Sequence, residues 1–166
     1  MIRREIALEV NGRSVHASVE PRQSLADYLR DGLDLTATHL GCEHGVCGAC
    51  TLLLDGEPVR GCITLAVAAE GRRVDTLEAF DEDPLMNLLR QAFSEHHGLQ
   101  CGFCTPGMLL MARDIILSDR VASDAELRVA MSGNICRCTG YAGILRAISA
   151  AREAWQARPH AATGPA

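Results

Sequence analysis

The sequence predicts an α+β protein in which a strand-rich N-terminal domain precedes an all-helical C-terminal domain. Apolar residues alternate in the period of a β-strand only before residue 76, whereas beyond residue 83 they recur at helical spacing. The 166 residues, 48% of them hydrophobic, suffice for one ordinary domain or two small ones. We therefore place the first domain at residues 1–78, the second at 79–158 and a disordered tail at 159–166.

The N-terminal domain is predicted to consist of β-strands and one short helix. The first two strands flank Asn-Gly, the dipeptide that best tolerates a tight hairpin turn, and a later pair flanks Asp-Gly. Ser24, three residues before Asp27, can cap a helix that ends near Gly32. Pro58 confines its strand to a sheet edge, because proline cannot donate a ladder hydrogen bond. The predicted strands are residues 6–10, 14–19, 51–54, 57–62 and 72–74.

Beyond residue 83 four helices are predicted, each with a recognisable start. Asp83 and Thr105 each precede a proline, and a capping side chain followed by proline is typical of a helix start. Ser123 with Glu126 forms a capping box for a third helix, and a long fourth helix should follow Thr139. The helix containing MLLMARDIIL is apolar nearly all round, so it should be buried against other helices or a partner.

Composition excludes several function classes. The formal net charge of -5 argues against nucleic-acid binding, and no apolar run is long enough to cross a membrane. The start, MIRREIALEV, lacks the continuous apolar stretch of an export signal. Eight cysteines without such a signal indicate a reducing compartment, the cytoplasm, where thiols stay free to bind metal.

Four cysteines in and after the run GCEHGVCGAC form the first candidate metal site. Their spacing, CxxxxCxxC followed by a fourth cysteine, is that of plant-type [2Fe-2S] sites. Gly41, Gly45 and Gly48 should adopt positive φ and bring N–H groups toward the sulfurs. Alternatives are a zinc site, buried free thiols or a Rieske-like role for His44, but four cysteines complete the ligand count. The predicted ligands are Cys42, Cys47, Cys50 and Cys62.

A second set of four cysteines lies in the helical domain, as CxxC in QCGFCTPG and CxC in NICRCTGY. Each pair stands just before a predicted helix start, at Thr105 and Thr139, where helix dipoles favour an anionic centre. This spacing suits zinc as well as iron, and the first site favours a second redox centre. The residues concerned are Cys101, Cys104, Cys136 and Cys138.

Together, GCEHGVCGACTLLLDGEPVRGC, GLQCGFCTPGMLL and GNICRCTGY resemble the small iron–sulfur subunit of the molybdenum hydroxylases, the xanthine dehydrogenase and aldehyde oxidase family. The resemblance covers nearly all of residues 3–157. It implies a plant-ferredoxin-like β-grasp domain and a four-helix bundle, each holding one [2Fe-2S] cluster. It also implies a heterotrimer, able to dimerise, with a large molybdopterin-binding subunit and a medium FAD-binding subunit.

The resemblance further implies an electron-transfer role, in an oxidoreductase, for a chain that has no catalytic residue itself. Electrons would pass from molybdenum to the cysteines of the bundle, then to those of the first loop, then to FAD. Gln100 matches a glutamine that hydrogen-bonds the pterin, and Cys138 a ligand whose sulfur approaches the pterin amino group. Arg137 could raise a cluster potential or simply be solvated, and His96-His97 most simply cap a helix end.

Two other functions fit the residues. A free-standing two-cluster electron carrier or redox sensor would dock transiently on several partners through an acidic face. A zinc-stabilised adaptor would be colourless and would unfold in chelators. The plant-type loop favours the molybdenum-hydroxylase interpretation over both. Substrate choice would then lie in the large subunit.

Overall fold

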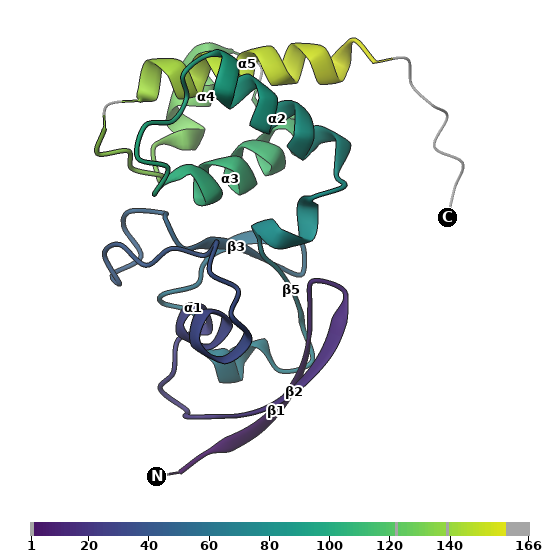
Figure 1. Ribbon diagram of the computed structural model, residues 1–166, viewed down its shortest axis with the longest axis vertical. Coiled ribbons are helices and arrows are strands. Elements are labelled where there is room, and N and C mark those ends of the chain that lie inside the picture. The colour runs from purple at the N-terminus through teal and green to yellow at the C-terminus, as the bar shows by residue number, and fades with distance from the viewer. Residues whose placement is uncertain (1, 122, 139, 159–166) are drawn as a thin grey trace.

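The computed structural model describes residues 2–121, 123–138 and 140–158. A five-stranded mixed sheet forms the N-terminal part and four helices form the C-terminal part, so the predicted α+β arrangement is confirmed (Figure 1). The sheet has the order β2-β1-β5-β3-β4, and only the β1–β5 pair is parallel. Its strands are β1 (Arg4–Val10), β2 (Arg13–Val19), β3 (Thr51–Leu54), β4 (Glu57–Arg60) and β5 (Arg73–Asp75).

The opening hairpin forms as predicted. Asn11 and Gly12 have φ of 50° and 75°, the left-handed backbone that a two-residue turn of this kind requires. Val10 therefore pairs with Arg13, and the register continues to Arg4 opposite Val19. Pro58 lies on β4 at the edge of the sheet, also as predicted.

One face of the sheet packs against a short helical segment. Ser24 accepts a hydrogen bond from the Asp27 N–H, which confirms the predicted cap of α1 (Leu25–Asp27). One turn of π-helix, η1 (Tyr28–Gly32), continues it. Short 3-10 turns, η2 (Ala66–Ala69) and η3 (Leu77–Phe80), flank β5. The first core contains chiefly Ile6, Leu8, Val10, Val19, Leu25, Leu29, Leu52, Leu54 and Val74.

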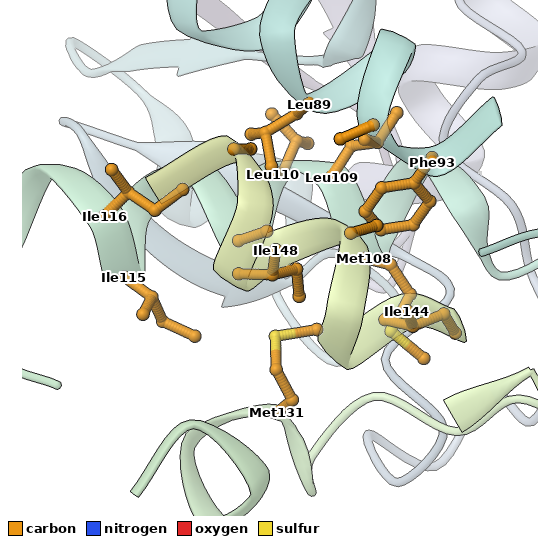
Figure 2. Packing of buried hydrophobic residues seen from close by; sticks show 14 of the residues in the cluster. Leu89, Phe93, Met108, Leu109, Leu110, Ile115, Ile116, Met131, Ile144 and Ile148 are labelled. Atoms are coloured by element: carbon orange, nitrogen blue, oxygen red, sulfur yellow. The ribbon is translucent and has the colours of Figure 1, made fainter. Parts of the chain in front are cut away.

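The four helices form a second core, part of which Figure 2 shows. Asp83 accepts from the Met86 N–H at 2.7 Å, and Ser123 forms the predicted capping box with Glu126. Leu89, Phe93, Met108 and Ile148 come from three helices and pack together. The helices are α2 (Pro84–Glu95), α3 (Thr105–Ser118), α4 (Asp124–Met131) and α5 (Tyr141–Gln156).

Helix α3 lies between the sheet and the other helices, which explains its unusually apolar sequence. It contacts β3 and β4 on one side and α2 and α4 on the others. All of β3 is buried: Leu52 and Leu54 belong to the sheet core, whereas Leu53 points into the helical core. The expectation that this helix is buried against other helices or a partner is therefore met within the chain, where α2, α4 and the sheet cover it.

One other expectation differs from the structure, and two lie outside what the structure describes. The strand predicted for residues 57–62 ends at Arg60, because the Arg60 carbonyl accepts from the Ile63 and Thr64 N–H groups and a turn begins there. Thr139 and the predicted tail, residues 159–166, lie outside the described residues. Among the helices of the described ranges, none is both long and apolar enough to cross a membrane.

Candidate metal centres

The cysteine loop at residues 41–50 is irregular and depends on glycine at two kinds of position. Gly45 and Gly48 have φ of 76° and 75°, as predicted, but Gly41 is not among the residues with positive φ. A Cβ on Gly41 would lie 3.2 Å from the Cys47 Sγ. Glycine is therefore favoured at position 41 because the Cys47 thiol approaches its backbone closely, and not because of its φ. Glu43, with φ of 55°, takes the remaining left-handed position.

Backbone N–H groups in this loop point toward the Cys42 sulfur. The amides of His44 and Cys47 each lie 3.4 Å from the Cys42 Sγ. These hydrogen bonds, that of His44 first, lower the pKa of the Cys42 thiol to about 6. The loop thus stabilises sulfur in the anionic form that binds metal, as its glycines predicted.

The four thiols of the first site lie close enough to interact. Cys42 interacts with Cys47, and Cys50 with Cys62, which the turn after β4 brings back to the loop, and less strongly with Cys47. Burial raises the pKa of the Cys50 thiol to about 11, so it needs positive charge nearby to ionise. Metal ions supply that charge, since a coordinating thiol is deprotonated outright.

The second site has the same organisation on a different scaffold. Cys101 interacts with Cys138, and Cys104 interacts with Cys136 and less strongly with Cys101. The Phe103 N–H lies 3.5 Å from the Cys101 Sγ and lowers the pKa of that thiol. Burial, reinforced by the Cys136 thiol, raises the pKa of Cys104 to about 12. Each site therefore combines one thiol whose pKa backbone amides lower with one thiol whose pKa burial raises.

The donor set of both sites fits a [2Fe-2S] cluster, which takes two thiolates on each iron. The structure brings thiols of each set of four within range of one another. Thr105, next to Cys104, also has a buried hydroxyl that lacks a partner within the described residues, so an acceptor from a cluster would satisfy it.

The predicted relation between cysteines and helix starts holds for one helix. Cys104 is the N-cap of α3, so this thiol lies directly at a helix N-terminus. Helix α5 begins at Tyr141, three residues after Cys138. The Tyr141 hydroxyl accepts from the Cys136 N–H at 2.9 Å and ties the second cysteine pair to that helix.

Gln100 lies beside the second site. Its side-chain Nε2 donates to the Cys138 carbonyl at 2.8 Å, which joins the two residues expected to contact a pterin. Both Gln100 and Arg137 are exposed.

The histidines near the cysteines contact the backbone. His44 uses Nδ1 to contact the Cys42 carbonyl, which agrees with a backbone-bonded histidine. His96 ends α2 as its C-cap.

Sequence reasoning missed the contacts that join the two sites. The Ile135 N–H donates to the Cys47 carbonyl at 2.8 Å, so the residue before Cys136 is bonded to a cysteine of the other site. Arg60 donates to the Gly133 carbonyl and to Thr51 Oγ1, each at 2.6 Å. These partners are separated by up to 88 residues, and no local pattern relates them.

Comparison with known proteins identifies both halves. Residues 8–79 match the family described as "2Fe-2S iron-sulfur cluster binding domain", and residues 76–149 match the "[2Fe-2S] binding domain" family. The chain is 54% identical to caffeine dehydrogenase subunit gamma of a Pseudomonas strain over 86% of its length and 87% of the relative's.

Two further relatives give the same result. The 6-hydroxypseudooxynicotine dehydrogenase complex subunit beta of Paenarthrobacter nicotinovorans is 49% identical, with 93% of this chain and 96% of the relative covered. A chain of quinoline 2-oxidoreductase from Pseudomonas putida superposes with a TM-score of 0.85 at 49% identity, covering 93% of this chain and 96% of that one. The chain therefore belongs to the family of small iron–sulfur subunits of molybdenum hydroxylases and is an electron-transfer subunit of a multi-subunit oxidoreductase.

Proposed function

We propose that this chain relays electrons from a molybdopterin site in a large subunit to FAD in a medium subunit of a heterotrimer. Cys101, Cys104, Cys136 and Cys138 would hold the [2Fe-2S] cluster that receives them, and Cys42, Cys47, Cys50 and Cys62 the cluster that passes them on. Each cluster, when bound, supplies one-electron redox chemistry. The chain contributes ligands, amide hydrogen bonds and the fixed relation between the two sites.

The observation that carries this proposal is the direct hydrogen bond between the two sites. The Cys47 carbonyl and the Ile135 N–H meet at 2.8 Å, and Ile135 is covalently next to Cys136. Two cysteines that would bind different clusters are thus connected by backbone and a single hydrogen bond. Such a connection suits a relay and is not needed by an adaptor whose two metals only stabilise structure.

The exposure of the second site supports contact with a pterin in a partner. Cys101 is exposed, and Gln100 is held against the backbone of Cys138. We propose that Gln100 and Cys138 contact the pterin cofactor of the large subunit. The hydrogen bond to the Cys138 carbonyl would keep the Gln100 side chain in position before the subunits assemble.

The domain limits at residues 1–78 and 79–158 belong to the same proposal. Leu77 and Phe80 of η3 pack on the helical core, which supports a boundary at this turn. All eight cysteines are free thiols arranged as two sites, and this supports residence in the cytoplasm.

The relatives also suggest a substrate class for the assembled enzyme. Caffeine and quinoline, which name two of them, are nitrogen-containing aromatic heterocycles. We propose that the holoenzyme hydroxylates a compound of this class at its large subunit. A panel of N-heteroaromatics and aldehydes, assayed with the purified complex, should show turnover of the former, and turnover of aldehydes alone would contradict this.

Low-temperature EPR of the dithionite-reduced complex, with iron counted on the same sample, tests the relay. Two distinct S = 1/2 signals and about four irons per chain are expected. Cys50→Ala should remove one signal and Cys104→Ala the other. Zinc in either site, or a chain that separates from any molybdenum-containing subunit at high salt, would contradict the proposal.

A further inference from the structure

His39 lies three residues before Cys42, so the sequence associates it with the first site. In the structure its ring contacts the second site instead. The His39 and Phe103 rings stack with centroids 4.7 Å apart and planes inclined by 21°. Nδ1 of the same ring lies 2.7 Å from the Phe103 carbonyl, where it must donate because a carbonyl can only accept.

Phe103 is the residue between Cys101 and Cys104, and its backbone acts on the second site directly. Its N–H points at the Cys101 Sγ from 3.5 Å. A residue that holds the carbonyl and the ring of Phe103 also limits how far this N–H can turn away from sulfur.

His39 is itself well supported. Arg30 on η1 donates through Nη1 to the carbonyls of Thr36 and Thr38, each at 2.9 Å. Thr38 is buried, with 2% of its surface exposed. The Ala37 N–H donates to Glu78 at 2.9 Å. The residues immediately before His39 are therefore anchored to the N-terminal half of the chain.

The Phe103 ring also lies against the first cysteine loop. A Cβ on Gly41 would lie 3.4 Å from the Phe103 Cε1, so the ring packs closely on the backbone next to Cys42. Nearly half of Phe103 is exposed, at 46%, so the stack and the hydrogen bond from His39 hold a residue that solvent partly surrounds.

We propose that His39 is a positioning residue for the second site, fixing the Cys101–Cys104 loop from the opposite half of the chain. It does so through the ring and carbonyl of Phe103, which keep the Phe103 N–H directed at Cys101. This rests on the proposed function, because the second site must hold a redox cluster for its potential to respond. A hydrogen bond to a ligand sulfur favours the reduced, more negative state, so its loss lowers the reduction potential.

The test is an EPR-monitored redox titration of the whole complex with His39→Ala and His39→Phe. His39→Ala removes the stack and the donor, whereas His39→Phe keeps an aromatic ring and removes only the donor. Both variants should lower the midpoint potential of the signal that Cys104→Ala abolishes, His39→Ala by more, and leave the other potential unchanged. His16→Ala, an exposed histidine on β2, is the matched control and should change neither.

Hydrogen–deuterium exchange of the same variants gives a second readout that does not depend on the clusters. The peptide containing Phe103 should exchange about fivefold faster in His39→Ala than in His16→Ala, as expected for loss of one ordinary hydrogen bond. Unchanged exchange, or a potential shift confined to the signal that Cys50→Ala abolishes, would overturn the role of His39. A wild-type complex with fewer than two signals would instead overturn the proposed function.

Discussion

The side-chain amide of Asn134 donates to the carbonyl of Gly48 at 3.1 Å, and this contact joins the two halves of the chain. The same nitrogen lies 3.3 Å from Thr51 Oγ1. Asn134 is buried, with 2% of its surface exposed. Gly48 leaves room for it, since a Cβ there would lie 2.7 Å from the Asn134 Cγ. The glycine that lets the first cysteine loop turn also lets the helical half dock on it.

Asn134→Ala should destabilise the protein, because it removes two buried hydrogen bonds and leaves a small cavity. We expect a loss of about 1–3 kcal/mol, which is roughly 3–10 °C in the thermal midpoint of a domain this size. Thermal unfolding followed by circular dichroism measures it. Asn87→Ala, an exposed asparagine on α2, is the control and should have little effect. Equal midpoints for the two variants would show that the Asn134 contact is dispensable.

Gly107→Ala should also be destabilising, although alanine is the better helix former by about 1 kcal/mol. A Cβ on Gly107 would lie 2.3 Å from the Gly48 carbonyl and 3.3 Å from that of Ala49. Backbone cannot move aside as a flexible side chain can, so α3 would be pushed off the cysteine loop. We expect a net cost of about 1–3 kcal/mol.

Urea unfolding of Gly107→Ala should be compared with Ser94→Ala, an exposed helical position in α2 where the gain in helix propensity acts alone. The control should be neutral or slightly stabilised. If both variants gain stability, α3 is not in the close contact with residues 48 and 49 that the structure describes.

Local signals predicted the elements well, because each depends on neighbouring residues. Asn11-Gly12 set the first turn, and Asp83 and Ser123 capped the helices that they precede. The two sets of four cysteines were identified from spacing, and the structure brings members of each set within range of one another. These features need no knowledge of how distant segments pack.

Docking between the halves could not be predicted in the same way. Arg60 and Asn134 look like surface residues in the sequence, yet they bond each other at 3.3 Å across the boundary. The apolar character of α3 was recognised, but not that Leu53 of β3 would help to cover it. His39 was overlooked because its partner, Phe103, is 64 residues away. Each of these depends on tertiary contacts that leave no periodic pattern.

Asp83 should make the stability of the helical half sensitive to acid. Burial alone would raise the pKa of its carboxyl, but hydrogen bonds from Arg113 and from the Met86 N–H outweigh this and lower it. Arg113 lies 2.7 Å from Oδ2, and the amide of Met86 lies 2.7 Å from Oδ1. Because the folded pKa is below the unfolded value of about 3.9, this stabilisation is present above that pH and is lost as pH falls through the folded pKa.

Two substitutions separate the contributions of Asp83. Asp83→Asn keeps an N-cap acceptor and loses the ion pair, whereas Asp83→Ala loses both, so costs of about 1 and about 2 kcal/mol are expected at pH 7. Urea unfolding at pH 7 and again below about pH 3 measures them. The deficit of Asp83→Asn should disappear at the lower pH, and a deficit that stays constant would mean that the carboxylate charge is not its source.

The Thr105 hydroxyl should respond differently with and without a cluster. It is buried beside Cys104 and has no hydrogen-bond partner in the part of the chain that the structure describes. In a chain without iron, Thr105→Val replaces an unpaired hydroxyl with a methyl group of similar shape, so stability should not fall.

In the loaded complex the Thr105 hydroxyl would donate to the cluster. Thr105→Val should then lower the potential of the signal that Cys104→Ala abolishes, while Thr105→Ser preserves it. Redox titration by EPR and thermal unfolding of the iron-free chain provide the two measurements. If Thr105→Val leaves the potential unchanged and destabilises the iron-free chain, the hydroxyl serves the fold and not the cluster.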